Sequence, residues 1–230
     1  PASQDGLTAA APFSEETLPL TQLLDLCRRD TLVLAGMAGE GLERLCAKRG
    51  LTLMDYASRE ELAVLNAVPT AEGALQIALE KLPTVLNGME VLVTGYGRVA
   101  KLCRRVFAGV GCKVTAAARS REALAWAEAD GAEPLPLNRM PEQLSRFRLV
   151  LNTVPHLLFG REELSRLPPG ALLIDLASLP GGTDFDAARE LGVQTVHALS
   201  LPGKAAPETA AAILCRTIRA IEAERREPDA

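Results

Sequence analysis

The segment VLVTGYGRVA at residues 91–100 limits the possible folds of this chain more than any other. A short apolar run leads into Gly95, Gly97 and Ala100, the G-x-G-x-x-A spacing of dinucleotide-binding turns. The first glycine of such a turn permits a sharp bend, the second lets the backbone approach a pyrophosphate, and the small third residue allows a helix to pack closely on a strand. The other turn residues that we expect beside the cofactor are Tyr96, Arg98 and Val99.

A glycine turn alone also occurs where only helix packing requires it. Here residues 99–110 place apolar side chains at helical spacing, and the apolar run KVTAA at 113–117 follows. Strand, glycine turn, helix and strand therefore occur in the order of a dinucleotide-binding unit, with the helix N-terminus available to the phosphates.

Arg119 occupies the region where a carboxylate normally binds the adenosine ribose of NAD. An arginine there makes charge-assisted hydrogen bonds with the 2′-phosphate of NADP instead. Ser120 and Arg121 follow it, so the sequence favours NADP over NAD. The alternative is that these residues only cap and solvate the next helix, with Ser120 as its N-cap.

Short apolar runs separated by helical or loop segments continue to residue 198. They lie at 90–94, 113–117, 133–137, 149–152, 171–176 and 194–198, and the run at 133–137, EPLPL, is weakened by two prolines. This alternation predicts an α/β fold with a doubly wound parallel sheet, that is, a Rossmann domain.

The residues before this sheet predict a second, smaller α/β domain. After a loop at 1–16 we expect a strand at 31–35, a helix at 40–49, a strand at 51–56, and a connecting helix with Thr70 as its N-cap that ends before Pro83. The expected ranges are an N-terminal domain at 1–82 whose first elements precede Pro1, a Rossmann domain at 83–204, and an amphipathic helix at 205–230 that returns to the first domain.

Composition excludes several classes of partner and chemistry. The net charge is −4 with both signs interspersed, which offers no broad positive field to nucleic acid or to an anionic membrane. The longest apolar runs fall short of the roughly 20 residues of a membrane helix. The five cysteines form no CxxC pair, and no HExxH motif or metal cluster occurs. We therefore expect a cytoplasmic protein without a metal.

Ligands of open α/β sheets bind outside the carboxyl ends of the strands. In the LVLNTVPH segment, Asn152, Thr153 and Pro155 would pass the nicotinamide ribose, although an Asx turn closed by a proline explains the same residues. His156 follows them, either as a proton acceptor or as an exposed loop histidine.

Two later loops offer groups that could hold a substrate carboxylate. The candidates are Ser178, Gly181, Gly182 and Thr183 in the first loop, and Gly203 and Lys204 in a turn before the last helix. Consecutive free amides would make the first loop an anion nest, and the Lys204 ammonium would add a positive charge in the second unless it is only solvated. Asp175 ends the preceding strand, where it either caps a buried amide or accepts a proton.

Five segments carry a family resemblance. They are LNAVPTAEGALQIALE, VLVTGYGRVAK, LNTVP, LIDLASLPGGTDF and LPGKAAPETA. In this order they resemble the A subunit of dipicolinate synthase from spore-forming bacteria, over nearly all of the chain from Leu65 onward. More distantly, the two-domain layout is similar to formate, glycerate and other D-2-hydroxyacid dehydrogenases and to S-adenosylhomocysteine hydrolase, whose catalytic histidine we cannot place here.

The resemblance implies an oxidoreductase of sporulation that makes pyridine-2,6-dicarboxylate in the mother-cell cytoplasm, together with a flavoprotein-like B subunit. We expect NADP-dependent dehydration and oxidation of 4-hydroxy-tetrahydrodipicolinate, a small dicarboxylate, by a chain that forms homo-oligomers. His156, Asp175 and Lys204 are the candidate catalytic groups. The alternatives are an NADP-dependent dehydrogenase of another small oxo or hydroxy acid, and a subunit that binds NADP but leaves the chemistry to its partner.

Overall fold

The computed structural model describes residues 2–3, 5–11 and 14–226. The chain divides into two compact units, one formed by Pro1–Ala63 with Ala212–Ala230 and the other by Val64–Ala211. This division differs from the ranges 1–82, 83–204 and 205–230 that we expected from the sequence. It does so because the long helices α3 (Glu60–Lys81) and α9 (Pro207–Arg226) each belong in part to both units.

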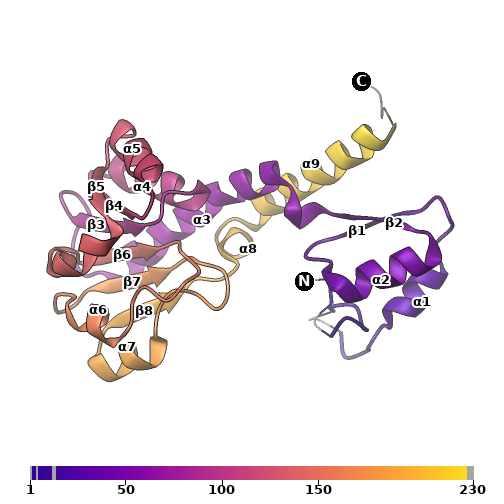
Figure 1. Ribbon diagram of the computed structural model, residues 1–230, viewed down its shortest axis with the longest axis horizontal. Coiled ribbons are helices and arrows are strands. Elements are labelled where there is room, and N and C mark those ends of the chain that lie inside the picture. The colour runs from indigo at the N-terminus through magenta and orange to yellow at the C-terminus, as the bar shows by residue number, and fades with distance from the viewer. Residues whose placement is uncertain (1, 4, 12–13, 227–230) are drawn as a thin grey trace. The chain divides into compact units, whose positions relative to one another are not determined.

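The larger unit contains a six-stranded parallel sheet with the order β5-β4-β3-β6-β7-β8. The strands are β3 (Glu90–Thr94), β4 (Lys113–Ala118), β5 (Glu133–Pro136), β6 (Leu149–Asn152), β7 (Leu172–Asp175) and β8 (Gln194–His197) (Figure 1). The strand order reverses between β3 and β6, so the predicted doubly wound fold is confirmed. The proline-containing β5 lies at the edge, where missing amide hydrogens interrupt no inner ladder.

Helices cover both faces of this sheet (Figure 1). They are α3, α4 (Arg98–Gly109), α5 (Arg121–Ala129) and α8 (Leu201–Ala205) on one face, and η2 (Leu137–Glu142), η3 (Leu144–Arg146), α6 (Arg161–Ser165) and α7 (Phe185–Leu191) on the other. Val91 and Val93 pack in the first layer and Leu92 in the second, and all three are wholly buried. Such continuous apolar runs are typical of parallel strands that are covered on both faces.

The connecting helix α3 begins at Glu60, so the prediction that Thr70 is its N-cap was wrong. Pro69 lies inside the helix, and the Thr70 hydroxyl donates to the backbone oxygen of Asn66 at 2.7 Å. The Pro-Thr pair resembled a helix start because proline and threonine are both common there. Glu60 and Glu61 instead supply the negative charge that a helix N-terminus favours.

By length and composition alone α3 could cross a membrane, with a mean hydropathy of 1.3, although charged and polar residues interrupt its apolar runs. Its residues Ala71, Ala74 and Ala78 are wholly buried in the same cluster as Val91 and Val93. The apolar composition of this helix therefore serves its packing on the sheet.

In the smaller unit, β1 (Leu32–Ala35) and β2 (Thr52–Asp55) pair in parallel. Val33 and Ala35 of β1 and Leu53 of β2 pack with the buried residues of α1 (Leu20–Asp25) and α2 (Gly39–Arg49). The strands and α2 agree with the predicted ranges 31–35, 40–49 and 51–56. The six-residue α1 was missed because it is too short to show helical periodicity.

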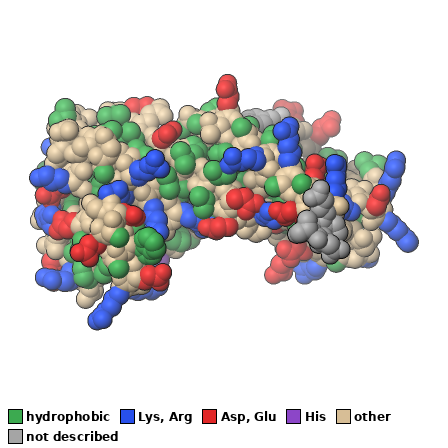
Figure 2. Space-filling view, turned by 90° about the horizontal axis from the view of Figure 1, so that it is seen from above, with side chains coloured by type: hydrophobic (Ala, Val, Ile, Leu, Met, Phe, Trp, Pro, Cys, Tyr) green, Lys and Arg blue, Asp and Glu red, His purple; other side chains and the backbone are tan. Residues whose placement is uncertain are grey.

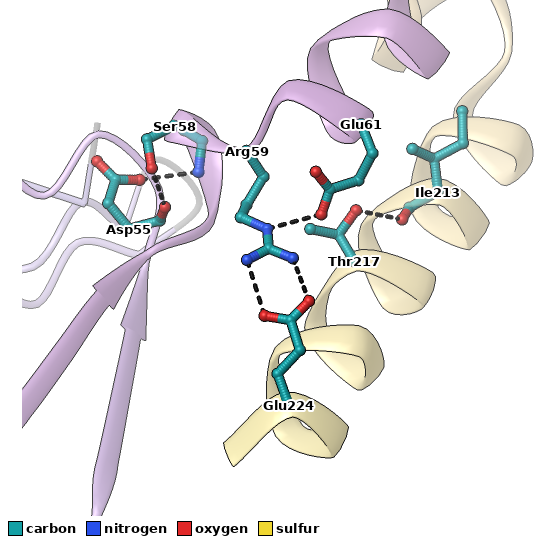
Figure 3. Close-up of polar contacts among 8 residues, drawn as sticks. Asp55, Ser58, Arg59, Glu61, Ile213, Thr217 and Glu224 are labelled. Carbon is teal, nitrogen blue, oxygen red and sulfur yellow. Dashed lines mark hydrogen bonds and ion pairs between the residues drawn. The ribbon is translucent and has the colours of Figure 1, made fainter. Parts of the chain in front are cut away.

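Arg59 joins the start of α3 to α9 within the smaller unit (Figure 3). It lies just after η1 (Tyr56–Ser58). Its guanidinium donates to both carboxylate oxygens of Glu224 at 2.9 and 2.5 Å, and to Glu61 Oε1 at 2.6 Å. The paired contact with Glu224 has the two-pronged geometry that makes arginine–carboxylate pairs specific. It holds the C-terminal part of α9 against this segment.

Acidic and basic side chains are interspersed on the face shown in Figure 2. This mixture agrees with the small net charge of −4. Several described pairs are local, including Arg166 with Glu162 and Arg189 with Asp186. Local pairing of this kind leaves little long-range field on the surface.

Candidate functional site

The glycine turn follows β3 and leads into α4. Gly95 has a φ of +79°, and a Cβ at this position would lie 2.9 Å from Thr153 Oγ1 and 3.0 Å from Val154 Cγ2. Any larger residue would meet both an unfavourable backbone conformation and the loop after β6. Ala100 is wholly buried, which allows α4 to pack closely on the sheet.

The N-terminus of α4 fits the pyrophosphate of a dinucleotide. Gly97 is the N-cap residue, no side chain accepts a hydrogen bond as a cap, and a Cβ at Gly97 would meet no atom within 4 Å. The first amides of the helix and its positive dipole end are thus approachable by phosphate oxygens. Arg98 is the first helical residue, whereas Val99 packs against the apolar cluster.

Tyr96 lies between the two glycines of the turn. Its side chain is buried, and its hydroxyl donates to Asp130 Oδ2 at 2.8 Å just after α5. Burial and the neighbouring Asp130 carboxylate raise the pKa of the Tyr96 phenol above its usual value. The Lys101 ammonium lies 4.5 Å from the centre of the Trp126 ring. Only the backbone of Tyr96 remains as a candidate cofactor contact.

Arg119, Ser120 and Arg121 are all exposed after the end of β4. Neither guanidinium group forms a hydrogen bond or ion pair with another described residue. Ser120 is the N-cap of α5, and its Oγ accepts from the Ala123 amide at 3.1 Å, which leaves its hydroxyl hydrogen to donate. Two unpaired positive charges and a hydroxyl donor beside the strand next to the glycine turn fit a phosphate monoester.

The last residues of four neighbouring strands form one row at the carboxyl edge of the sheet. Thr94 is in register with Asn152, Asn152 with Asp175, and Asp175 with His197. Thr94, Asn152 and Asp175 are wholly buried. The row begins beside the glycine turn and lies at the edge where such sheets bind their ligands.

Hydrogen bonds connect this row. Thr94 Oγ1 donates to Asn152 Oδ1 at 2.6 Å, and Asn152 Nδ2 donates to Asp175 Oδ1 at 2.9 Å. The backbone amide of Val154 also donates to Asn152 Oδ1, at 3.2 Å, as in the Asx turn that the sequence offered as an alternative. Because a backbone N–H can only donate, this bond fixes the orientation of the Asn152 side chain.

Asp175 accepts four hydrogen bonds. Its partners are Asn152 Nδ2, the backbone amides of Ala177 at 3.1 Å and Gly182 at 2.8 Å, and the Thr183 hydroxyl at 2.7 Å. The buried carboxylate therefore holds the loop that follows its own strand. This agrees with the prediction that Asp175 caps buried amides.

The prediction of consecutive free amides at Gly181 and Gly182 was wrong. The Gly182 amide bonds to Asp175, and the Gly181 amide donates to the backbone oxygen of Ser178 at 2.8 Å. An internal carboxylate thus occupies the place that we assigned to a bound anion. The Ser178 side chain is exposed in this loop, whereas Thr183 is buried.

Gly182 brings the loops after β6 and β7 together. Its backbone oxygen accepts from the amides of Leu158 at 2.9 Å and Phe159 at 3.0 Å. A Cβ at Gly182 would lie 2.4 Å from Asn152 Nδ2 and 2.6 Å from the Val154 oxygen. Thr153 in the same region donates to the backbone oxygen of Thr94 at 2.6 Å, so both loops are tied to the end of β3.

Pro155 and His156 lie in the loop after β6, where His156 is exposed. The expected turn at Gly203 and Lys204 is instead the short helix α8, in which both residues are exposed. Pro202 is the second residue of this helix, a position where proline is well tolerated. The apolar side of α8 packs closely on α3, where a Cβ at Gly73 would lie 3.0 Å from Ala205 Cβ. Lys204 forms no hydrogen bond or ion pair within the described ranges.

The sequence does not identify two members of the row. It marks Thr94 only as the end of a strand and assigns His197 no role. The ring of His197 stacks on Phe185 with centroids 4.9 Å apart, and its Nε2 is buried without a described partner. Thr94 and His197 each end a strand, and this shared position is the sequence signal that could have identified them. The described residues contain no group of three potential metal ligands.

Known proteins are similar in sequence to this chain. Residues 62–178 match the model of the D-isomer specific 2-hydroxyacid dehydrogenase, NAD binding domain. The chain is 31% identical to the A subunit of dipicolinate synthase from Bacillus subtilis over 220 residues, which cover 96% of this chain and 74% of that protein.

Solved structures show the same relationship. The A subunit of dipicolinate synthase from Bacillus halodurans has a TM-score of 0.88 at 31% identity, with 96% of this chain and 76% of that chain covered. The corresponding structure from Bacillus subtilis has a TM-score of 0.90 at 30% identity, with 99% and 76% covered. A transhydrogenase from Sinorhizobium meliloti shares the fold, with a TM-score of 0.69 at 20% identity over 86% and 69% of the two chains.

The matched domain supports a nicotinamide cofactor and an oxidoreductase activity. Sequence identity and fold agree over nearly the whole chain. The chain belongs to the family formed by the A subunits of dipicolinate synthases, and its doubly wound sheet is an NAD-binding domain of the 2-hydroxyacid dehydrogenase type.

Proposed function

We propose that this chain is the NADP-dependent subunit of a dipicolinate synthase, which converts 4-hydroxy-tetrahydrodipicolinate into pyridine-2,6-dicarboxylate. The observation that carries the proposal is the pair of unpaired guanidinium groups, Arg119 and Arg121, beside a glycine turn in a chain of this family. The 2′-phosphate of NADP supplies the negative charge that these groups lack within the described structure.

The proposed cofactor contacts lie at or just after the carboxyl ends of β3, β4 and β6. Gly95, Gly97 and the first amides of α4 would hold the pyrophosphate, with Arg98 at the first helical position. Arg119, Ser120 and Arg121 would hold the 2′-phosphate. Asn152, Thr153 and Pro155, at the end of β6, would lie on the nicotinamide side of the sheet.

The reaction loses water from the substrate and then removes a hydride and a proton, which leaves an aromatic ring. Bound NADP+ supplies the hydride acceptor. Ser178 and Lys204, both exposed, are the groups that we assign to the substrate carboxylates. His156 is the proposed proton acceptor, because both oxygens of Asp175 already accept hydrogen bonds.

We also propose that the chain works in the mother-cell cytoplasm, as a homo-oligomer that associates with a flavoprotein-like B subunit. A second candidate function is a subunit that binds NADP but leaves the chemistry to this partner. The full engagement of Asp175 favours it, since only His156 then remains as a titratable group among the predicted catalytic residues at the carboxyl ends of β6 and β7.

One assay tests these proposals. The purified chain, with and without the B subunit, is given NADP+ and the fresh condensation product of aspartate semialdehyde and pyruvate, and dipicolinate is measured. Product with this chain alone supports the synthase, and product only with the B subunit supports shared catalysis. No product in either mixture, with NADPH still bound tightly, would favour a dehydrogenase of another small oxo or hydroxy acid.

A further inference from the structure

Asp175 is a buried negative charge at the carboxyl edge of the sheet. It is 0% exposed, and its four partners all donate hydrogen bonds to it. Three of them are amide N–H groups, which can donate a hydrogen bond to Asp175 but cannot accept one from it. A carboxylate, which offers only acceptors, satisfies all four partners at once.

The four groups that donate to Asp175 belong to Asn152, Ala177, Gly182 and Thr183, and none of these groups carries a positive charge. His197 on β8 is the register partner of Asp175. Both face Gly181, where a Cβ would lie 3.1 Å from Asp175 Oδ2 and 3.3 Å from His197 Nε2.

The order of the strands places this charge on one side of the dinucleotide site. A dinucleotide on a doubly wound sheet crosses the switch point, here between β3 and β6, with one mononucleotide on each half. Arg119 follows β4 on the first half, which assigns the adenosine end to that side. The nicotinamide end then belongs to the half that contains β6 and β7, which end at Asn152 and Asp175.

We propose that the Asp175 carboxylate makes this site bind the oxidised nicotinamide nucleotide in preference to the reduced one. The oxidised ring carries one positive charge, whereas the reduced ring is neutral, so only the oxidised form is attracted. The attraction is larger than it would be in water, because dielectric screening is weaker in a buried environment. A site with this preference holds the hydride acceptor and releases the reduced product, as an oxidation of substrate requires. The inference rests on the proposed cofactor site.

The test is a comparison of two dissociation constants, measured at pH 8 and one ionic strength for NADP+ and NADPH without substrate. In Asp175→Asn, which keeps the size of the side chain, we expect the ratio of the NADPH constant to the NADP+ constant to fall by about threefold or more. Thr183→Val is the matched control, because it removes one hydrogen bond to Asp175 but leaves the charge. In this control we expect both constants to change together.

An unchanged ratio in Asp175→Asn, with both nucleotides still bound, would overturn the inference and leave the cofactor site intact. Failure of the wild-type protein to bind either NADP(H) or NAD(H) would instead refute the proposed cofactor site. The wild-type protein carries a second test that needs no folded variant. It should bind NADP+ more tightly than NADPH, and a preference for NADPH would overturn the inference.

Discussion

The side-chain amide of Asn152 donates to the carboxylate of Asp175 at 2.9 Å and so joins the ends of β6 and β7. On its other side Asn152 accepts from Thr94, the last residue before the glycine turn. One buried asparagine therefore connects the strand that precedes the glycine turn with the carboxylate that holds the loop after β7.

We expect Asn152→Ala to destabilise the protein by about 2–4 kcal/mol, because it leaves the Thr94 hydroxyl, the Val154 amide and Asp175 each short of a partner. The free energy of unfolding is measured by urea titration. Asn138→Ala is the control, since Asn138 is exposed and should change stability by less than about 0.5 kcal/mol. Equal effects of the two substitutions would contradict the role of Asn152.

A substitution of Gly182 tests how closely the loops after β6 and β7 must approach each other. Gly182→Ala places a Cβ 2.4 Å from Asn152 Nδ2 and 2.6 Å from the Val154 oxygen, so the loops must separate. We expect a loss of stability of about 2 kcal/mol or more and weaker nucleotide binding. Gly203→Ala is the control, because its Cβ meets no atom within 4 Å in α8 and alanine favours a helix. Thermal unfolding of both variants gives the comparison.

The sequence predicts the larger unit well because its signals are local. Apolar runs and the glycine turn mark all six strands and α4. The site is predicted less well, because its contacts join residues far apart in the chain. Nothing near Gly182 in the sequence shows that its amide is taken by Asp175, or that Thr94 lies beside Asn152. The start of α3 was misplaced for the opposite reason, since a local signal at Thr70 was outweighed by packing.

The ion pair between Arg146 and Glu133 should make the stability of the protein depend on pH. Its guanidinium lies 2.9 Å from Glu133 Oε2, and this contact, helped by the Thr115 hydroxyl, holds the pKa of Glu133 below its usual value. A carboxyl with a lowered pKa in the folded state stabilises the protein above the unfolded value, about 4.3, and loses that effect as pH falls through the folded pKa. Arg146→Met should therefore be less stable than wild type at pH 7, by up to about 1 kcal/mol for this partly exposed pair.

The difference between wild type and Arg146→Met should shrink as the pH is lowered below about 4, as followed by urea unfolding at a series of pH values. Arg139→Met is the control, because Arg139 and Glu142 form a looser, exposed pair at 3.8 Å. A difference for Arg146→Met that stays constant down to about pH 3 would show that lost packing, and not the ion pair, is responsible.

We expect Arg119 to determine whether the protein prefers NADP or NAD. We expect Arg119→Ala to weaken NADPH binding about 10–100-fold, since a charge-assisted hydrogen bond is lost, and to leave NADH binding unchanged. Fluorescence titration of both nucleotides measures the preference. Arg105→Ala is the matched control, because Arg105 is also exposed and also lacks an ion pair within the described ranges, but lies in α4 away from its first turn. If Arg119→Ala kept the wild-type preference between NADPH and NADH, Ser120 would remain only a helix cap. The absence of a carboxylate at the position of Arg119 would then no longer argue for NADP.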